Sequence, residues 1–378
     1  MSELVFSNAR IVLADAVITG SVVVRDGVIA EIAEGAATTG EDLSGEFLLP
    51  GLVELHTDHF EKHYRPRPGV TWNAMAALQA HDAQIAGAGI TTVFDAVRIG
   101  SDPEYGELTE DVRAQVEAIA AGDAAGRLRA DHRIHLRCEL PTPDVIGHFE
   151  EHAGKPIVGL ASLMDHTPGQ RQYTTLEHYI AYYQARLRLS DAEMRSFIER
   201  RHAERDQYSE ASRKAILAHG RSLGLAFASH DDATEAHVAE AVADGMSIAE
   251  FPTTVPAARA AHAAGMAVLM GGPNVVRGGS HNGNVSAAEL AEAGVLDVLS
   301  SDYVPFSLLH AAFVLPEMTE AVSLPQAVAM VSKTPAAAAD LDDRGEIAVG
   351  KRADLVRVSR TDAVPVVRGV WRQGQRVS

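Results

Sequence analysis

The chain has 378 residues, 46% of them hydrophobic, which suits one large α/β barrel with a smaller partner domain. Its formal net charge of −18 argues against nucleic-acid binding, which depends on a basic surface. The sequence lacks a signal peptide, a long apolar run and a second cysteine beside Cys138, so we expect a cytoplasmic protein with no membrane partner and no disulfide framework.

Both ends of the chain are rich in short β-type runs. Residues 1–48 contain LVFSNARIVLAD and AVITGSVVVRDGVIAEIAEG, and residues 341–378 contain GEIAVGKRADLVRVSR and AVPVVRGVWRQGQRVS, each pair separated by turn signals. Residues 49–340 instead alternate short apolar runs with Ala-rich helical stretches. This alternation predicts βα units and a parallel sheet.

Eight apolar runs in the middle of the chain are predicted strands, and most of them end in polar residues. The runs are residues 51–58, 89–96, 133–140, 156–166, 224–232, 246–254, 266–274 and 295–303. Eight strand–helix units predict a (β/α)8 barrel of the TIM type, whose active site lies at the C-terminal ends of the strands. The clusters HTDH, CEL, DH, SHDD and SDY fall at those ends and are therefore predicted to line one site.

A long charged segment, residues 173–223, exceeds what one crossover helix requires, and its composition favours helix. Three interpretations stay open for it. It is a lid, a contact in a homo-oligomer, or a solvated pair of helices.

Six strand-end residues are candidate metal ligands: His56, Asp58, Glu139, His166, His230 and Asp302. Taken singly, each is as easily a helix cap or a hydrogen-bonded loop residue. Six at one end of one barrel favour one or two divalent metal ions, and the donors are compatible with Zn²⁺, Mn²⁺ or Fe²⁺. Asp302 has a second predicted role as the catalytic base, because a last-strand carboxylate can accept the proton of an attacking water.

Because side chains alternate between the two faces of a strand, their spacing determines which of them share a face. Residues two apart share a face, so His56 and Asp58 point the same way. Cys138 lies between Arg137 and Glu139 on the opposite face, which predicts a core thiol.

Basic residues gather in the segments expected on the same face of the barrel. The predicted phosphate-binding residues are Lys62, Arg65, Arg67, Arg137, Arg171, Arg277 and His281, and Arg98 adds a charge after the second strand. Arg277 and His281 belong to the segment GGPNVVRGGSHNGN, expected as a Gly-rich loop whose backbone N–H groups face phosphate oxygens. Surface ion pairing is the alternative for each arginine. Their shared location in an acidic chain favours an anionic substrate.

The segments PGLVELHTD and GEIAVGKRADLV resemble those of the amidohydrolase superfamily. The resemblance implies that residues 1–48 and 341–378 combine into a small β-sandwich domain beside a metal-binding barrel of residues 49–340.

Two positions depart from the usual pattern of that superfamily. The first strand has His56-x-Asp58 in place of His-x-His, and the sixth ends in Glu250 where a ligand His is common. Glu250 is therefore a candidate substitute ligand. His59 is a ligand, a phosphate contact or neither.

A narrower resemblance covers nearly the whole chain. LVELHTDHFEKHYRPRPGV, HRIHLRCELP, SLMDHTPGQRQY and SSDYVPFSLLHAAF are similar to the triphosphate diphosphatases of the carbon–phosphorus lyase pathway. This similarity implies that the substrate is a ribose 1-methylphosphonate carrying a 5-triphosphate. Hydrolysis would release diphosphate and leave the 5-phosphate, as a step of phosphonate catabolism.

Two other functions stay open. A metal-dependent deacylase or cyclic amidase would use similar ligands but would not need a ring of arginines, and release of an amine would identify it. A non-catalytic assembly subunit would be expected to lose the ligands, whereas His56, His230 and Asp302 are all present.

Overall fold

The computed structural model describes residues 3–101, 106, 108–171, 176–280 and 283–378. The chain divides into two compact units. Unit 1 comprises Met1–Asp95, Ala118–Arg133 and Met270–Ser378, and unit 2 comprises Ala96–Glu117 and Ile134–Leu269. The domain boundaries predicted near residues 48 and 340 stay predictions.

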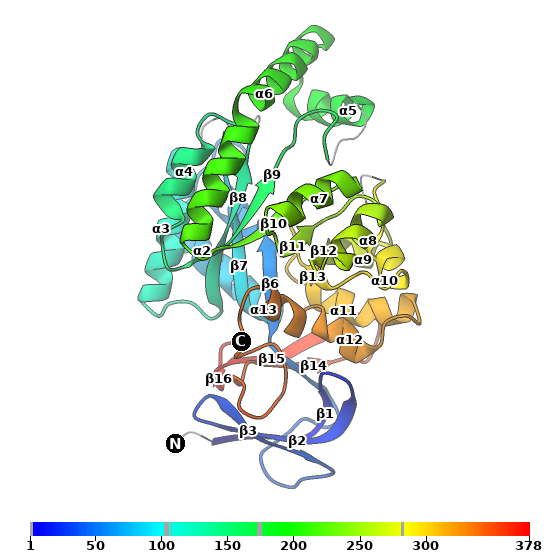
Figure 1. Cartoon of the computed structure of the whole chain (residues 1–378). Coiled ribbons are helices and arrows are strands. Elements are labelled where there is room, and N and C mark those ends of the chain that lie inside the picture. Colours follow the sequence, from blue (N-terminus) through cyan, green and yellow to red (C-terminus); the bar gives the residue numbers. More distant parts are fainter. Residues whose placement is uncertain (1–2, 102–105, 107, 172–175, 281–282) are drawn as a thin grey trace. The chain divides into compact units, whose positions relative to one another are not determined.

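Strands β6 to β13 form one eight-stranded sheet in sequence order (Figure 1). They are β6 (Leu52–Thr57), β7 (Ile90–Ile99), β8 (Asp131–Glu139), β9 (Val158–Met164), β10 (Ala226–His230), β11 (Ile248–Glu250), β12 (Ala267–Gly271) and β13 (Val298–Ser300). Their pairings are parallel, for example β8 with β9 and β10 with β11. Each predicted strand contains or overlaps one of these strands, so the barrel prediction is confirmed.

The first and last strands of the sheet meet within unit 1. Thr57 and Asp302 form a parallel bridge, and the Asp302 N–H donates to the His56 carbonyl oxygen over 3.1 Å. The sheet therefore curls towards a closed barrel, in which the C-terminal ends of all strands point to one side.

A second, mixed sheet is built from both ends of the chain, as predicted. Its strands are β1 (Glu3–Val12), β2 (Val17–Arg25), β3 (Val28–Glu34), β4 (Glu41–Asp42), β5 (Phe47–Pro50), β14 (Leu355–Ser359), β15 (Val366–Arg372) and β16 (Gln375–Arg376). β1 pairs antiparallel with β2 and parallel with β5, and β5 pairs antiparallel with β14. Phe6 packs edge-on against Trp371 at 4.8 Å between ring centroids, which joins the two ends in one core.

The helices are α1 (His59–Tyr64), α2 (Ala74–Gly87), α3 (Thr109–Ala124), α4 (Val145–His152), α5 (Leu176–Leu187), α6 (Asp191–Ser222), α7 (Glu235–Ala243), α8 (Val255–Ala263), α9 (Gly272–Arg277), α10 (Ala287–Glu292), α11 (Ser307–Met318), α12 (Leu324–Ala329) and α13 (Lys333–Ala338). The predicted helical insertion contains α5 and α6 (Figure 1). α6 is 32 residues long and starts at a capping box, in which the Ser190 side chain accepts from the Glu193 N–H and the Glu193 carboxylate from the Ser190 N–H.

The Gly-rich segment after β12 is not a loop throughout. It begins with helix α9, because Pro273 has a backbone conformation suited to a first helical turn and Gly278, at φ 77°, supplies the left-handed residue that ends it. The expectation of an open loop is wrong for residues 272–277.

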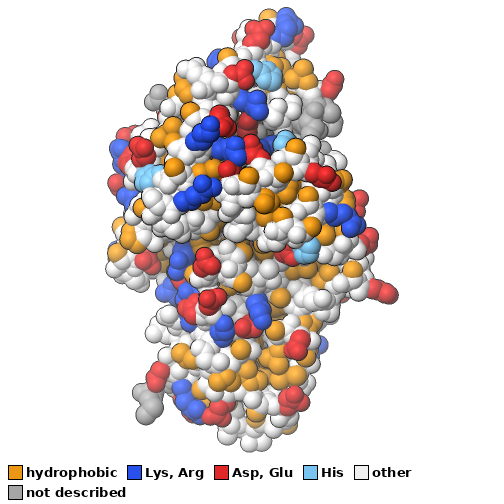
Figure 2. Space-filling model, in the orientation of Figure 1, with side chains coloured by type: hydrophobic (Ala, Val, Ile, Leu, Met, Phe, Trp, Pro, Cys, Tyr) orange, Lys and Arg blue, Asp and Glu red, His pale blue; other side chains and the backbone are white. Residues whose placement is uncertain are grey.

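The structure also bears on the single cysteine and on the surface charge. Cys138 is fully buried and burial raises the pKa of its thiol, which confirms the predicted core thiol. On the face drawn in Figure 2, basic and acidic side chains are interspersed. Among the described residues, no helix is both long and apolar enough to cross a membrane.

Candidate functional site

Unit 1 brings His56, Asp58 and Asp302 together at the ends of β6 and β13. His56 is buried as the fifth residue of β6, and Asp58 directly precedes α1. The Asp58 N–H donates to the Asp302 carbonyl oxygen over 3.3 Å, and Asp302 adopts a left-handed conformation at φ 53°. The backbone thus holds two predicted carboxylate donors beside one histidine.

Glu54, the third residue of β6, was not predicted as a site residue. It is fully buried, its carboxylate accepts from the His56 N–H over 2.6 Å and from the Ser301 N–H over 2.5 Å, and burial raises its pKa to about 7. Glu54 therefore joins β6 to the segment after β13 and fixes the backbone on both sides of His56. Its E-x-H-x-D spacing, with three polar side chains on one face of an apolar strand, was the available signal.

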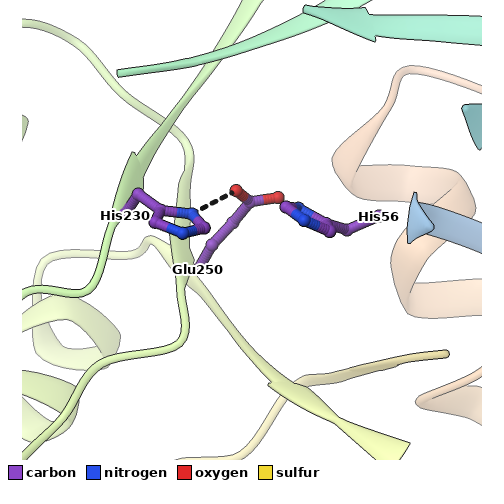
Figure 3. A group of neighbouring side chains, drawn as sticks. All are labelled: His56, His230 and Glu250. Atoms are coloured by element: carbon purple, nitrogen blue, oxygen red, sulfur yellow. Dashed lines mark hydrogen bonds and ion pairs between the residues drawn. The ribbon is translucent and has the colours of Figure 1, made fainter. Parts of the chain in front are cut away.

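In unit 2, His166 and His230 each contact a buried glutamate through Nδ1. His166 Nδ1 lies 2.5 Å from Glu139 Oε2, and His230 Nδ1 lies 3.1 Å from Glu250 Oε2, the bond drawn in Figure 3. Each histidine therefore has one ring nitrogen fixed by a buried carboxylate. In metal sites such a partner sets the tautomer and leaves Nε2 for the ion.

The two Nε2 atoms face one further side chain, Asp231. Asp231 Oδ2 lies 3.5 Å from His230 Nε2 and 3.9 Å from His166 Nε2. It is buried without a hydrogen-bond partner, and burial raises the pKa of Asp231 to about 6. One ligand atom from each of His166, His230 and Asp231 lies within 4.8 Å of the others, so this group fits a divalent cation.

Among the predicted ligands, Glu139 contacts one histidine and two arginines. Besides His166, Arg98 contacts its carboxylate at 3.1 Å and Arg201 at 3.6 Å. Burial opposes ionisation of Glu139, but His166 and Arg98 hold its pKa well below the ordinary value. The Glu139 carboxylate accepts from His166, and the Asp231 carboxylate faces the Nε2 atoms of His166 and His230. His56, from β6 of unit 1, is the third side chain drawn in Figure 3.

His59 and Lys62 turn towards the segment after β13. His59 Nδ1 lies 3.2 Å from the Tyr303 carbonyl oxygen and its Nε2 3.0 Å from Gln84 Oε1. Lys62 donates to the same carbonyl oxygen over 3.1 Å. Both ring nitrogens of His59 thus lie within hydrogen-bond distance of protein groups in this structure.

The other predicted phosphate-binding residues differ in their exposure and in their partners. Arg171 is half-buried and is already paired with Asp232 and with Glu240 at 3.2 Å, on the wall of a cavity of about 470 Å³. Arg137 is half-buried on β8, and Arg277 is exposed at the end of α9.

The basic loop after α1 is open to solvent. Arg67 is exposed and Arg65 is half-buried. His281 lies outside the described residues.

A second buried group of titratable side chains lies in unit 1, and the sequence reasoning missed it. Asp95 on β7 accepts from His81 Nε2 and from His132 Nδ1, each over 2.7 Å, and His132 Nε2 lies 3.3 Å from Asp82 Oδ1. Burial alone would lower the pKa of His132, but Asp95 and Asp82 raise it to about 9. Hydrogen bonds account for both oxygens of Asp95, so this network joins α2, β7 and β8.

The chain is similar to proteins of one known family. The family model described as Amidohydrolase family matches residues 189–378. Over 377 residues the chain is 48% identical to the alpha-D-ribose 1-methylphosphonate 5-triphosphate diphosphatase of Escherichia coli (strain K12), and the match covers 99% of this chain and 100% of that protein.

Two solved structures share the fold. One is a 5-methylcytosine deaminase from Klebsiella pneumoniae, with a TM-score of 0.66, 15% identity and coverage of 99% of this chain and 98% of the other. The second is an N-acetylglucosamine-6-phosphate deacetylase from Pasteurella multocida, with a TM-score of 0.61, 14% identity and coverage of 99% of each chain. At such identities the likeness shows the fold alone.

Proposed function

This chain belongs to the amidohydrolase family, and from that membership we propose that it hydrolyses α-D-ribose 1-methylphosphonate 5-triphosphate to diphosphate and the 5-phosphate. The observation that carries the proposal is the full-length similarity to the Escherichia coli diphosphatase. The chain is accordingly a hydrolase that acts on a phosphoanhydride, in phosphonate catabolism.

The family generally uses divalent metal ions, and the residues of this chain fit one. In unit 2 we assign the ligand atoms to His166, His230 and Asp231, with Glu139 and Glu250 orienting the two histidines. In unit 1 the predicted ligands His56, Asp58 and Asp302 stay candidates. The buried Oδ2 of Asp231, which has no hydrogen-bond partner, supports this assignment. Burying a carboxylate oxygen destabilises the fold unless a donor or a cation binds it. The mixed imidazole and carboxylate donors suit Zn²⁺, Mn²⁺ or Fe²⁺.

When bound, a divalent ion makes water acidic enough to react at neutral pH and neutralises phosphate oxygens. Asp302 is positioned by its backbone bond to His56 and accepts the proton of the attacking water. Arg98 and Arg137 supply positive charge on the oxygens of the departing diphosphate. Phosphoryl transfer needs little else from a protein than positioning and charge stabilisation.

The test is to incubate the metal-loaded protein with α-D-ribose 1-methylphosphonate 5-triphosphate and follow the products by ³¹P NMR. We expect diphosphate and a 5-monophosphate in equal amounts, and neither product with Asp302→Asn. Release of inorganic phosphate alone would place cleavage at the other anhydride bond. No phosphorus chemistry in a protein with stoichiometric metal would refute the proposal and favour an amide substrate.

A further inference from the structure

Helix α6 of the insertion carries a buried arginine that continues an apolar face. Met194, Phe197 and Arg201 follow one another at spacings of three and four residues, and all three are buried. Met194 and Phe197 pack with Tyr179 of α5 in a small core, where Tyr179 and Phe197 stack at 6.3 Å between centroids. Because residues at these spacings share one face of a helix, the core also fixes the direction of Arg201.

Arg201 is only partly satisfied by the protein. Its side chain is 7% exposed, one terminal nitrogen lies 2.8 Å from Glu204 and the other 3.6 Å from Glu139. Its Nε is buried and has no hydrogen-bond partner. A buried guanidinium with an unused donor is unfavourable unless a further acceptor binds there.

The acceptor that fits is an anion close to the proposed reaction centre. Glu139, the carboxylate beside Arg201, lies at the C-terminal end of β8 and holds His166, an assigned ligand, at 2.5 Å. Arg98 contacts the same carboxylate at 3.1 Å, so two guanidinium groups share one Glu139. Phosphate oxygens, like carboxylates, match the planar donor geometry of a guanidinium.

We propose that Arg201 binds the triphosphate of the substrate, so that the insertion contributes directly to the substrate site. This inference rests on the proposed function. It assigns Arg201 to the triphosphate and not to the methylphosphonate, because Arg201 is one carboxylate away from a side chain that holds the metal, where the reacting phosphorus must lie. The insertion is then a part of the substrate site.

The test compares Arg201→Gln and Arg201→Lys with a matched control, Arg200→Gln, in the metal-loaded full-length protein. Arg200 is the neighbouring residue on α6, also faces Glu204, at 4.0 Å, and is 63% exposed. We expect kcat/KM to fall roughly 10²-fold in Arg201→Gln, mainly through KM, and to recover in part in Arg201→Lys. Arg200→Gln should stay within about twofold of the wild type.

A second measurement does not need turnover. Calorimetric titration with inorganic tripolyphosphate should give a Kd raised about tenfold or more in Arg201→Gln and unchanged in Arg200→Gln. If the wild type binds tripolyphosphate through Arg201 but releases no diphosphate, the proposed function fails while this inference stands. Equal affinity and equal kinetics in the wild type and Arg201→Gln would overturn the inference.

The substrate can be varied to identify which end Arg201 contacts. With ribose 5-triphosphate, which lacks the methylphosphonate, the loss in Arg201→Gln should persist. If the loss disappears with this substrate, the assignment to the triphosphate is wrong. Circular dichroism melting of each variant separates binding from folding, and Arg201→Lys, which keeps the charge but lacks the planar guanidinium, serves if Arg201→Gln does not fold.

Discussion

Asp231 combines three features that are costly for a purely structural residue. It is buried, it adopts a left-handed conformation at φ 55°, and its Oδ2 has no hydrogen-bond partner. Strain and unsatisfied polar atoms of this kind are retained at functional sites. We expect Asp231→Asn to reduce the metal bound per chain, measured by mass spectrometry, and to lower kcat/KM roughly 10²-fold. Asp206→Asn, on the exposed side of α6, is the control, and full metal content in Asp231→Asn would refute the ligand role.

His132 makes the stability of the protein depend on pH. Its pKa in the folded chain is about 9, above the ordinary 6.5, so its bound proton stabilises the fold below pH 6.5. That contribution is lost as the pH rises through about 9, because the unfolded chain no longer holds the proton. We expect the free energy of unfolding to fall by on the order of 2 kcal/mol between pH 6.5 and 9.5. Urea titrations of His132→Gln should show a smaller fall over the same range, and parallel curves would contradict the assignment.

At the scale of the elements, α6 rests on β10 through a glycine. A Cβ at Gly220 would lie 2.4 Å from the ring of Phe227, whereas one at Gly147 of α4 would meet no atom within 4 Å. We therefore expect opposite effects from the same substitution. Gly220→Ala should destabilise the fold by roughly 1–3 kcal/mol through overpacking, and Gly147→Ala should stabilise it by about 0.5–1 kcal/mol. Urea unfolding measures both, and shifts of the same sign would show that the packing of α6 on β10 is not tight.

The elements were predictable from the sequence where periodicity and chain order determine them. Eight apolar runs predicted the strands, because a strand buried on both faces is a short continuous apolar run that can be recognised without knowing its neighbours. Arg201 and Asp231 were missed because their importance depends on neighbours from other elements. In the sequence, Arg201 cannot be told from the other charged residues of the long helix α6, because the sequence does not show which face of the helix is buried. Arg171 was predicted as a phosphate contact from its place after the fourth strand, and its ion pairs with Asp232 and Glu240 could not be derived from the sequence.

At the scale of the whole molecule, the C-terminal segment helps to support the barrel strands of unit 1. Within unit 1, Arg344 is buried, pairs with Asp131 at the start of β8 and donates to Thr92 of β7 over 3.0 Å. Arg352 lies 3.3 Å from the same Asp131 carboxylate. The C-terminal segment thus neutralises a half-buried charge on a barrel strand. The predicted homo-oligomer and cytoplasmic location stay predictions.

Metal removal should weaken the whole fold as well as stop the reaction. The assigned ligands lie at or just after the ends of barrel strands, so an ion that binds only the folded chain stabilises the strand ends that it contacts. We expect chelation to abolish diphosphate release and to lower the free energy of unfolding by about 2.7 kcal/mol when free metal had been at 100 times its Kd. Adding back Zn²⁺ or Mn²⁺ should restore both quantities in the wild type. Asp231→Asn should respond less to the chelator, because it holds less metal at the start. A protein shown by mass spectrometry to be metal-free, yet with unchanged activity and stability, would remove the metal from the mechanism.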